Sequence, residues 1–599
     1  MKLSNELRKL GDFTTTIRVL PIAGLAIAIG VVGAYVALAL LRLIGLFTNL
    51  FYYQRLSSAL VSPAGNHIGW WAVLVPVAGG LIIGLMARYG SERIRGHGIP
   101  EAIESILIGG SKVQPRLAIL KPLSAALSIG TGGPFGAEGP IIMTGGAFGS
   151  MIAQFLHLTS AERKTLLVAG AAAGMSATFA APLSAILLAV ELLLFEWKPR
   201  SLIPVALASA TAGAARRYLI GLGPLFPTPP HPVFIGPAGL IGCVICGILA
   251  GALSALLTSA VYAAEDAFAK LPIHWMWWPA IGGLAIGLGG MIFPQALGVG
   301  YDTIDSLLQG NGALGLLLGI LLVKSTIWAV SLGSGTSGGV LAPLLMMGGA
   351  LGGLEASFLP AAGAGFWPLV SMGAILGGTM RSPLTGIVFA IELTHDVNMI
   401  LPLIVAAVIA HTFTVLVLKR SILTEKVARR GFHLSREYSV DPLEALFVRE
   451  VMHTRLIAFD ASGSVDEARS LLKNGDPTRG QHLYPVIDAD RRLSGVITRK
   501  DLAAYSGEWT LMSDVARGNP VVAVADEPLR AAVYRMAETG CTRMPVVDSY
   551  LERRIVGMVS SEDLLGAHSR SLAEERSRER VLRIRLPFRG AKDSSPTTK

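Results

Sequence analysis

The feature that most constrains this chain is the extent of its apolar sequence, which carries few charges from about residue 18 to residue 418. Within it lie long apolar runs, at residues 20–41, 70–87, 236–263 and 313–323. About 20 apolar residues are enough for a helix to cross a bilayer. From about residue 425 the sequence becomes mixed and rich in Arg, Asp and Glu. We therefore expect a mainly α-helical, polytopic membrane protein followed by a water-exposed part.

The composition and the two ends of the chain agree with this expectation. Hydrophobic residues make up 52% and charged residues only 15%, with a mean hydropathy of +0.56. Residues 1–17 are polar and basic, which favours a cytoplasmic N-terminus before a retained first membrane helix. The basic tail, residues 569–599, favours solvent or a lipid surface over nucleic acid as its partner, and we expect a cytoplasmic C-terminus.

The apolar region contains an internal repeat. "SIGTGGPFGAEGPIIMTGGAFG" (128–149) overlays "SLGSGTSGGVLAPLLMMGGALG" (331–352) at a shift of 203 residues. Further pairs are Lys121 with Lys324, Pro182 with Pro383 and Glu191 with Glu392. The membrane part is therefore two halves of one ancestral unit, and the letters alone leave open whether the halves are parallel or inverted. Repeated apolar segments broken by Gly and Pro indicate a binding site near the membrane midplane.

Three pentapeptides share one design: "GHGIP" (96–100), "GAEGP" (136–140) and "GVLAP" (339–343). Gly permits unusual dihedrals and close approach, and Pro is favoured in a first helical turn. Each pentapeptide predicts a helix that begins inside the membrane, with free N–H groups that suit an anion. The candidate anion-binding residues are His97, Gly98, Ile99, Gly136, Gly139, Val340 and Leu341.

Glu138 is the one carboxylate in its apolar segment, and a charge at mid-membrane is costly enough to indicate a function. At a helix N-terminus its carboxylate can act as a tethered anion that competes with a diffusing one. The alternative is that Glu138 only caps its own helix.

These motifs resemble those of the CLC family of chloride channels and transporters over about 400 residues. "GHGIPE", "GAEGP", "GGVLAP", "AAPLSAILLAVE" and "SPLTGIVFAIE" match the family's motifs in order. The resemblance implies an inverted repeat, a homodimer with one pore per subunit in the cell membrane, chloride as the transported anion, and Glu138 as the gate.

Several positions depart from the family's pattern. His97 replaces its anion-coordinating serine, Leu341 its aromatic residue, Leu423 its pore tyrosine, and Leu192 the second glutamate of its transporter pair. Glu191 keeps the first glutamate, so Glu191 and His97 are the candidate proton-path residues. Because the relay glutamate is absent, we expect channel-like or weakly coupled chloride transport, with strict H⁺/Cl⁻ exchange as the alternative. His97 could be a neutral donor to the anion, a pH-sensitive cation, or a wet vestibule residue.

The polar region holds a second repeat. "LYPVIDADRRLSGVITRKDL" (483–502) is echoed by "RMPVVDSYLERRIVGMVSSEDL" (543–564), each predicting strand, turn, strand and helix start. The pair resembles a tandem CBS (Bateman) module, an α+β fold that binds nucleotides. The candidate ribose-binding residues are Thr498, Asp501, Ser560 and Asp563, with ATP, ADP or AMP as ligand; capping of the two helices is the alternative.

The predicted domains follow from these patterns: residues 1–17, a membrane domain 18–424, CBS repeats 445–506 and 511–568, and the tail. Rival functions are a CBS-gated divalent-cation channel and a membrane nucleotide sensor without a pore. Because the sequence shows no metal cluster, nucleophilic triad or P-loop, we expect neither an enzyme nor a required cofactor or metal. Cys243 and Cys246 lie in an apolar, small-residue helix, where close packing is favoured over a metal or redox site.

Overall fold

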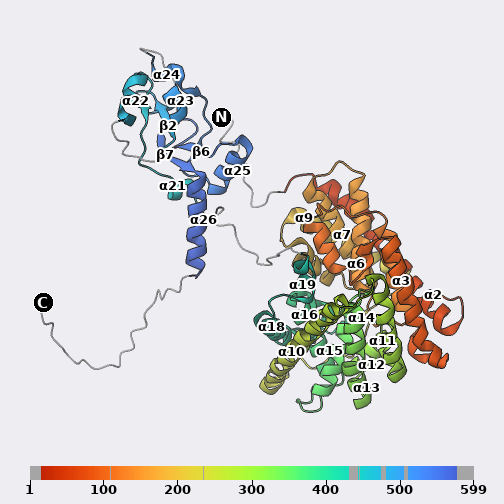
Figure 1. Ribbon diagram of the computed structural model, residues 1–599. Coiled ribbons are helices and arrows are strands. Elements are labelled where there is room, and N and C mark those ends of the chain that lie inside the picture. The colour runs from red at the N-terminus through yellow and green to blue at the C-terminus, as the bar shows by residue number, and fades with distance from the viewer. Residues whose placement is uncertain are drawn as a thin grey trace, which may run out of the picture. The chain divides into compact units, whose positions relative to one another are not determined.

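The chain forms two compact units, seen in Figure 1 of the computed structural model. The structure describes residues 15–107, 109–233, 235–430, 443, 446–473, 481–504 and 510–576. Described residues up to Arg430 form the helical unit, and those from Leu443 onward form the second unit. The predicted N-terminal segment, residues 1–17, and the basic tail, residues 569–599, lie largely outside the described residues.

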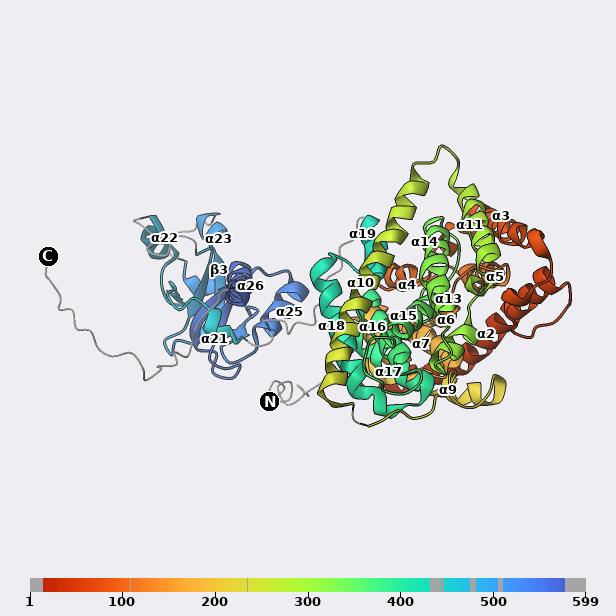
Figure 2. The same cartoon turned by 90° about the horizontal axis from the view of Figure 1, so that it is seen from below.

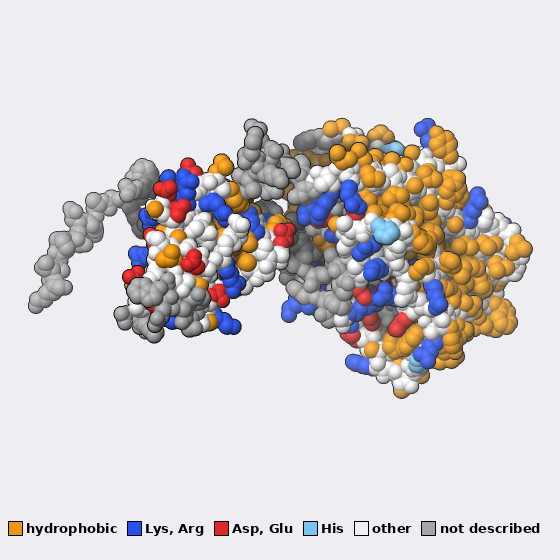
Figure 3. Space-filling view, turned by 90° about the horizontal axis from the view of Figure 1, so that it is seen from above, with side chains coloured by type: hydrophobic (Ala, Val, Ile, Leu, Met, Phe, Trp, Pro, Cys, Tyr) orange, Lys and Arg blue, Asp and Glu red, His pale blue; other side chains and the backbone are white. Residues whose placement is uncertain are grey.

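The helical unit is built from long apolar helices around shorter ones. Six helical stretches in the described part of the chain are long and apolar enough to cross a membrane: Val19–Tyr53, Gly69–Tyr89, Gly236–Ala269, Trp275–Ile292, Leu314–Gly333 and Val397–Arg429. Figure 3 shows apolar side chains covering much of one face of this unit. Such a surface suits contact with lipid acyl chains.

The helices of the first half are α2 (Val19–Tyr53), α3 (Leu74–Tyr89), α4 (Ile99–Leu107), α5 (Leu117–Gly130), α6 (Glu138–Gln154), α7 (Ser160–Phe179), α8 (Pro182–Leu188, continued by the π-helical turn Ala189–Leu194) and α9 (Pro199–Leu219). Those of the second half are α10 (Gly236–Ala269), α11 (Trp278–Ile292), α12 (Tyr301–Leu308), α13 (Leu314–Gly319), α14 (Ser325–Gly333), α15 (Leu341–Glu355), α16 (Phe366–Met380), α17 (Pro383–Thr394) and α18 (Ile400–Val417), followed by α19 (Ile422–Arg429).

The three Gly- and Pro-containing pentapeptides each start a helix, as the sequence predicts. Helix α4 begins at Ile99, α6 at Glu138 and α15 at Leu341. Figure 2 shows α6 and α15 in the middle of the helical unit, between α10 and α18 on one side and α2 and α3 on the other. The predicted broken helices are therefore confirmed, and their N-termini lie inside the unit.

Contacts between equivalent residues show that a two-fold axis relates the two halves. Gly136 and Gly339, which the repeat aligns, exchange two antiparallel backbone hydrogen bonds of 3.1 and 2.8 Å. Such an exchange between equivalent residues places a two-fold axis between them. At this contact the two repeated segments run in opposite directions.

A second reciprocal contact joins α8 and α17. Glu191 Oε2 accepts hydrogen bonds from the Thr385 N–H and hydroxyl, at 2.9 and 2.5 Å, at the start of α17. Glu392 accepts hydrogen bonds from Leu183 N–H and from the N–H and hydroxyl of Ser184, at the start of α8. Each carboxylate thus caps the helix that bears the other, which satisfies N–H groups left free at the helix start.

The repeated lysines also take equivalent places. Lys121 donates to the carbonyls of Ile94 and Gly96, both at 2.8 Å, and Lys324 donates to the carbonyl of Gly298 at 3.1 Å. Both lysines are fully buried. Each ammonium therefore fixes the loop before a short helix, α4 in one half and α12 in the other.

The second unit contains two copies of one motif. The first has α21 (Val448–Val451), β1 (Phe459–Asp460), α22 (Val465–Lys473), β2 (Leu483–Ile487), β3 (Leu493–Thr498) and α23 (Arg499–Ala504), and the second has α24 (Met512–Val515), β4 (Arg517–Gly518), β5 (Ala523–Val524), α25 (Leu529–Thr539), β6 (Arg543–Val547), β7 (Ile555–Ser560) and α26 (Ser561–Arg576). The sheets run β1-β2-β3-β4 and β5-β6-β7, and each has a parallel pair followed by an antiparallel pair. The predicted strands and helix starts are confirmed.

The reciprocal caps predict matched losses of stability. Glu191→Ala and Glu392→Ala should each destabilise the helical unit by about 1 kcal/mol or more, because each leaves helix-start N–H groups unpaired. Thermal unfolding of the purified protein in detergent checks this. Tm values that fall for one variant and not for the other would contradict the symmetric arrangement.

Candidate functional site

The site forms where three interrupted segments meet. Gly136 pairs with Gly339, as described above, and Gly96 N–H donates to the Thr336 carbonyl at 3.3 Å. A Cβ added at Gly139 would lie 1.7 Å from the His97 carbonyl oxygen. The segments that start α4, α6 and α15 are therefore in direct backbone contact, and most of the predicted anion-binding residues are brought together.

Glu138 is the acidic side chain at this meeting point and is fully buried. Its Oε1 accepts a hydrogen bond of 3.0 Å from Ala342 N–H, in the first turn of α15. Its Oε2 has no hydrogen-bond partner among the described residues. The carboxylate of one half thus lies at the N-terminus of a helix from the other half, where a negative charge is favoured. We call this position the Glu138 seat.

The glycines beside Glu138 make room for its carboxylate. A Cβ at Gly136 would lie 1.8 Å from Glu138 Oε2, and a Cβ at Gly339 would lie 2.6 Å from the same oxygen. Both separations are far below van der Waals contact. Any larger side chain at Gly136 must therefore displace the carboxylate or the backbone.

His97 lies on the loop before α4 and is almost completely buried. Its Nδ1 finds no hydrogen-bond partner in the part of the chain that the structure describes. Gly96 and Gly98 flank it in the left-handed region, with φ of 80° and 89°. Because only glycine takes these angles at low cost, the flanking glycines set the direction of the histidine.

One predicted donor is already engaged. Gly98 N–H donates to Glu101 Oε2 at 3.0 Å, while Glu101 Oε1 pairs with Lys426 at 2.9 Å and with Arg430 at 3.3 Å. Glu101 thus caps its own helix and ties α4 to α19. In this arrangement, the Gly98 N–H is directed to a carboxylate of the protein and not to a passing anion.

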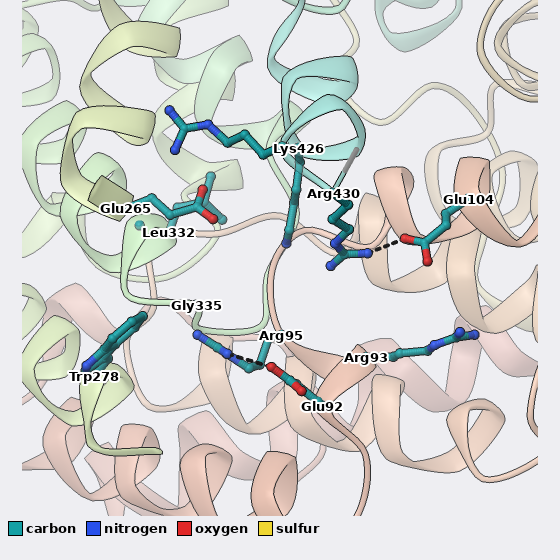
Figure 4. A pocket seen from close by; sticks show the side chains of 12 residues that line it. Glu92, Arg93, Arg95, Glu104, Glu265, Trp278, Leu332, Gly335, Lys426 and Arg430 are labelled. Atoms are coloured by element: carbon teal, nitrogen blue, oxygen red, sulfur yellow. Dashed lines mark hydrogen bonds and ion pairs between the residues drawn. The ribbon is translucent and has the colours of Figure 1, made fainter. Parts of the chain in front are cut away.

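A cavity of about 450 Å³ opens beside the His97 loop, and Figure 4 shows its lining. Arg95 and Gly335 form part of its wall. Both lie within two residues of the bridged pair Gly96 and Ser337. Its other lining residues are Glu92, Arg93, Glu104, Glu265, Trp278, Leu332, Gly333, Lys426, Arg429 and Arg430. Five of these twelve side chains are basic and three are acidic, so the cavity offers an anion a net attractive surface. We call it the basic vestibule.

The remaining predicted residues of the helical unit are buried or partly buried. Val340, Leu341, Leu423 and Leu192 are apolar core positions. Glu191 does not lie free in a path, because it caps α17. Cys246 donates to Glu355 at 2.9 Å, and no group of three His, Cys, Asp or Glu side chains that could hold a metal occurs among the described residues.

The candidate ribose-binding residues lie at the capped starts of α23 and α26, and a cavity lies beside those of the second motif. Thr498 accepts from Asp501 N–H at 3.1 Å, and Ser560 N–H donates to Asp563 Oδ2 at 2.8 Å. Hydrogen bonding to Thr498 and the Arg517 guanidinium hold the pKa of Asp501 below its ordinary value. A cavity of about 520 Å³ lies beside Ser560 and Asp563 of the second motif. Its lining also includes His453, Arg455, His482 and Arg543.

Comparisons with known proteins identify the family. The family model described as voltage gated chloride channel matches residues 79–415, more than half of the chain. The chain belongs to this family. The CBS domain model matches twice, at residues 448–508 and 512–570. The protein is thus a CLC-type membrane protein of chloride transport with a tandem CBS module, as the sequence motifs predict.

Sequence relatives belong to the same family, and solved structures share the fold. The chain is 30% identical over 395 residues to "Putative chloride channel protein ClcB-like" of Ralstonia nicotianae, covering 64% of this chain and 92% of the relative. It is 33% identical to the H(+)/Cl(-) exchange transporter ClcA of Yersinia pestis, covering 54% of this chain and 70% of the relative. The fold resembles a slow cyanobacterial Cl-/H+ antiporter (TM-score 0.62, 20% identity, 70% and 99% covered) and a eukaryotic CLC transporter (TM-score 0.57, 20% identity, 91% and 98% covered).

Sequence reasoning missed the charged residues around the site. Lys121 and Lys324 align in the repeat, but the sequence indicates no role for either lysine, although a charged residue in an apolar helix usually has a role. The residues that form the basic vestibule come from helices and loops far apart in the sequence. Only the fold brings Arg95, Lys426 and Arg430 together.

The seat predicts that Gly136→Ala acts through Glu138. Because the new Cβ collides with the carboxylate, we expect chloride flux into liposomes to change in the same direction as in a variant without the carboxylate. Gly24→Ala is the matched control, since a Cβ there meets nothing within 4 Å. Equal flux in Gly136→Ala and Gly24→Ala would contradict the tight seat.

Proposed function

We propose that this protein conducts chloride through a pore in each subunit and that Glu138 is its gate. The observation that carries the proposal is the Glu138 seat, in which a buried carboxylate occupies the N-terminus of α15. Chloride enters from the basic vestibule, passes His97 and reaches the seat. There it competes with the carboxylate for the N–H groups that start α6 and α15.

The weak hold on the carboxylate supports gating over permanent occupation. Glu138 Oε1 has one backbone donor in this structure, and no lysine or arginine pairs with it among the described residues. A neutral N–H contact is easier to exchange than a buried ion pair, whose disruption leaves an unpaired charge. Protonation or displacement of Glu138 would then free the seat for an anion.

We propose that transport is channel-like or weakly coupled to protons. Glu191, the candidate relay, is engaged with Thr385, and Leu192 provides no titratable group beside it. Leu423 leaves a purely apolar side chain where the family's pore tyrosine lies. An exchanger needs a titratable relay or a water chain to Glu138. The described residues therefore favour passive anion flow.

Strict H⁺/Cl⁻ exchange is the second candidate. It is favoured by the names of relatives, which include exchange transporters at 33% identity. His97 is then the candidate proton carrier, because its buried Nδ1 is unpartnered among the described residues. The same nitrogen could instead donate to the anion and set its selectivity.

We further propose that the CBS module binds an adenine nucleotide, chiefly at the second motif. There Asp563 lines the 520 Å³ cavity together with Arg455, His482 and Arg543. The carboxylate suits ribose hydroxyls, and the basic groups suit phosphate. His453 Nε2 now lies 2.6 Å from Asp563 Oδ1 and would give way to the ribose. At the first motif, Asp501 pairs instead with Arg517 at 2.9 Å.

Membrane placement and assembly complete the proposal. We propose a multi-pass protein of the cell membrane with cytoplasmic termini, which lets the CBS module sense cytoplasmic nucleotides. A homodimer is proposed from the family resemblance. Leu183 and Leu384, which the repeat aligns at the starts of α8 and α17, are both about half exposed and provide an apolar surface for lipid or a second subunit.

A liposome assay separates channel from exchanger. With a chloride gradient applied, we expect dissipative chloride flux and no uphill proton movement. Glu138→Gln should raise chloride flux several-fold and remove most of its pH dependence, because the amide cannot ionise. Glu355→Gln is the matched control, since Glu355 is a buried carboxylate at the far end of α15. Uphill proton transport that Glu138→Gln abolishes would refute the channel-like proposal in favour of exchange.

For the nucleotide site, Asp563→Asn should weaken ATP, ADP or AMP binding by about tenfold or more, the effect of losing charged hydrogen bonds to a ribose. Asp501→Asn, the matched change at the first motif, should alter the Kd about twofold at most. Isothermal calorimetry on the purified protein measures both. No binding by the unmodified protein at millimolar nucleotide would leave both motifs as helix caps.

A further inference from the structure

Tyr301, the first residue of α12, has a buried hydroxyl that no contact yet explains. The hydroxyl oxygen has no hydrogen-bond partner among the described residues. The ring packs edge-on against Phe226, with centroids 5.9 Å apart, so the side chain is held in place. Buried hydroxyls are nearly always hydrogen-bonded, and an unpaired one indicates a partner that comes and goes.

The start of α12 lies close to the Glu138 seat along one face of α15. Ala342 donates to Glu138, and Met346 follows one helical turn later on the same face. A Cβ at Gly300 would lie 2.8 Å from Met346 Sδ. The start of α12 therefore packs against α15 one helical turn from the seat.

These two packed elements each carry a buried oxygen without a hydrogen-bond partner among the described residues, one able to donate and one able to accept. Glu138 Oε2 is an acceptor without a partner in the described part of the chain, and Tyr301 carries the spare O–H. The cation nearest to Gly300 is Lys324, whose ammonium donates a hydrogen bond of 3.1 Å to the Gly298 carbonyl. Tyr301 also lines a cavity of about 70 Å³, together with the exposed Asp302.

We infer that Tyr301 is a positioning residue of the gate, whose hydroxyl donates a hydrogen bond to the Glu138 carboxylate when it leaves its seat. The inference rests on the proposed gating role of Glu138. A carboxylate that leaves Ala342 N–H inside the protein needs a new donor, because an unpaired buried charge is costly. By binding only the displaced carboxylate, the hydroxyl shifts the gate toward its open state. The carboxylate in its seat forms no hydrogen bond with the Tyr301 hydroxyl and is not stabilised by it.

The test is a double-mutant cycle on chloride efflux from proteoliposomes, with Tyr301→Phe, Glu138→Ala and the double variant. Tyr301→Phe removes one oxygen and keeps the ring against Phe226. We expect it to lower chloride flux about fivefold to tenfold when Glu138 is present, and to have no effect in the Glu138→Ala background. Tyr52→Phe is the control, because Tyr52 is a buried tyrosine whose hydroxyl already donates to the Thr131 carbonyl at 3.1 Å.

Each other outcome overturns the inference. Equal loss of flux in both backgrounds would make Tyr301 a structural residue only. Unchanged or raised flux in Tyr301→Phe would show that the hydroxyl does not stabilise the open gate. If Glu138→Ala itself leaves flux unaltered, the gating proposal fails and the role of Tyr301 fails with it. A measurable Glu138→Ala effect without coupling to Tyr301 rejects the inference alone.

Discussion

The helical unit depends on the two backbone hydrogen bonds that Gly136 and Gly339 exchange. Because the two glycines are equivalent positions of the repeat, this contact lies on the axis that relates the halves. It sets the N-termini of α6 and α15 against each other, where their partial positive charges add. The absence of a side chain at both positions leaves a space that only the Glu138 carboxylate fills. The Glu138 seat is thus a consequence of the contact between the two halves of the repeat.

The distribution of charge around this contact follows the same logic. The two buried lysines, Lys121 and Lys324, are satisfied by backbone carbonyls, and Glu101 is the carboxylate that takes up Lys426 and Arg430. Glu138 is left with a neutral N–H donor. A lysine at the seat would hold the carboxylate, or a chloride ion, too strongly for release. Charged side chains therefore fix the loops and line the vestibule, while backbone N–H groups face the Glu138 carboxylate.

The sequence predicted what local patterns and the repeat encode. The Gly and Pro signals located the starts of α4, α6 and α15, and the short apolar runs of the second repeat located β2, β3, β6 and β7. It could not predict partners far apart in the chain, such as Glu191 with Thr385 or Gly136 with Gly339 as a bonded pair. The resemblance made Glu191 a proton-path candidate, whereas the structure engages it as a helix cap. The Gly98 N–H was expected to face an anion, but Glu101 lies three residues on and reaches back to it.

The most direct test of the account is to locate the anion when the carboxylate is absent. Crystals of Glu138→Gln grown in bromide would reveal the anion by its anomalous scattering. The account predicts a bromide ion within hydrogen-bonding distance of Ala342 N–H, between Gly136 and Gly339, in the place that the carboxylate now holds. Bromide bound only elsewhere, with this place filled by the glutamine side chain or left without an anion, would contradict the competition on which the gate depends.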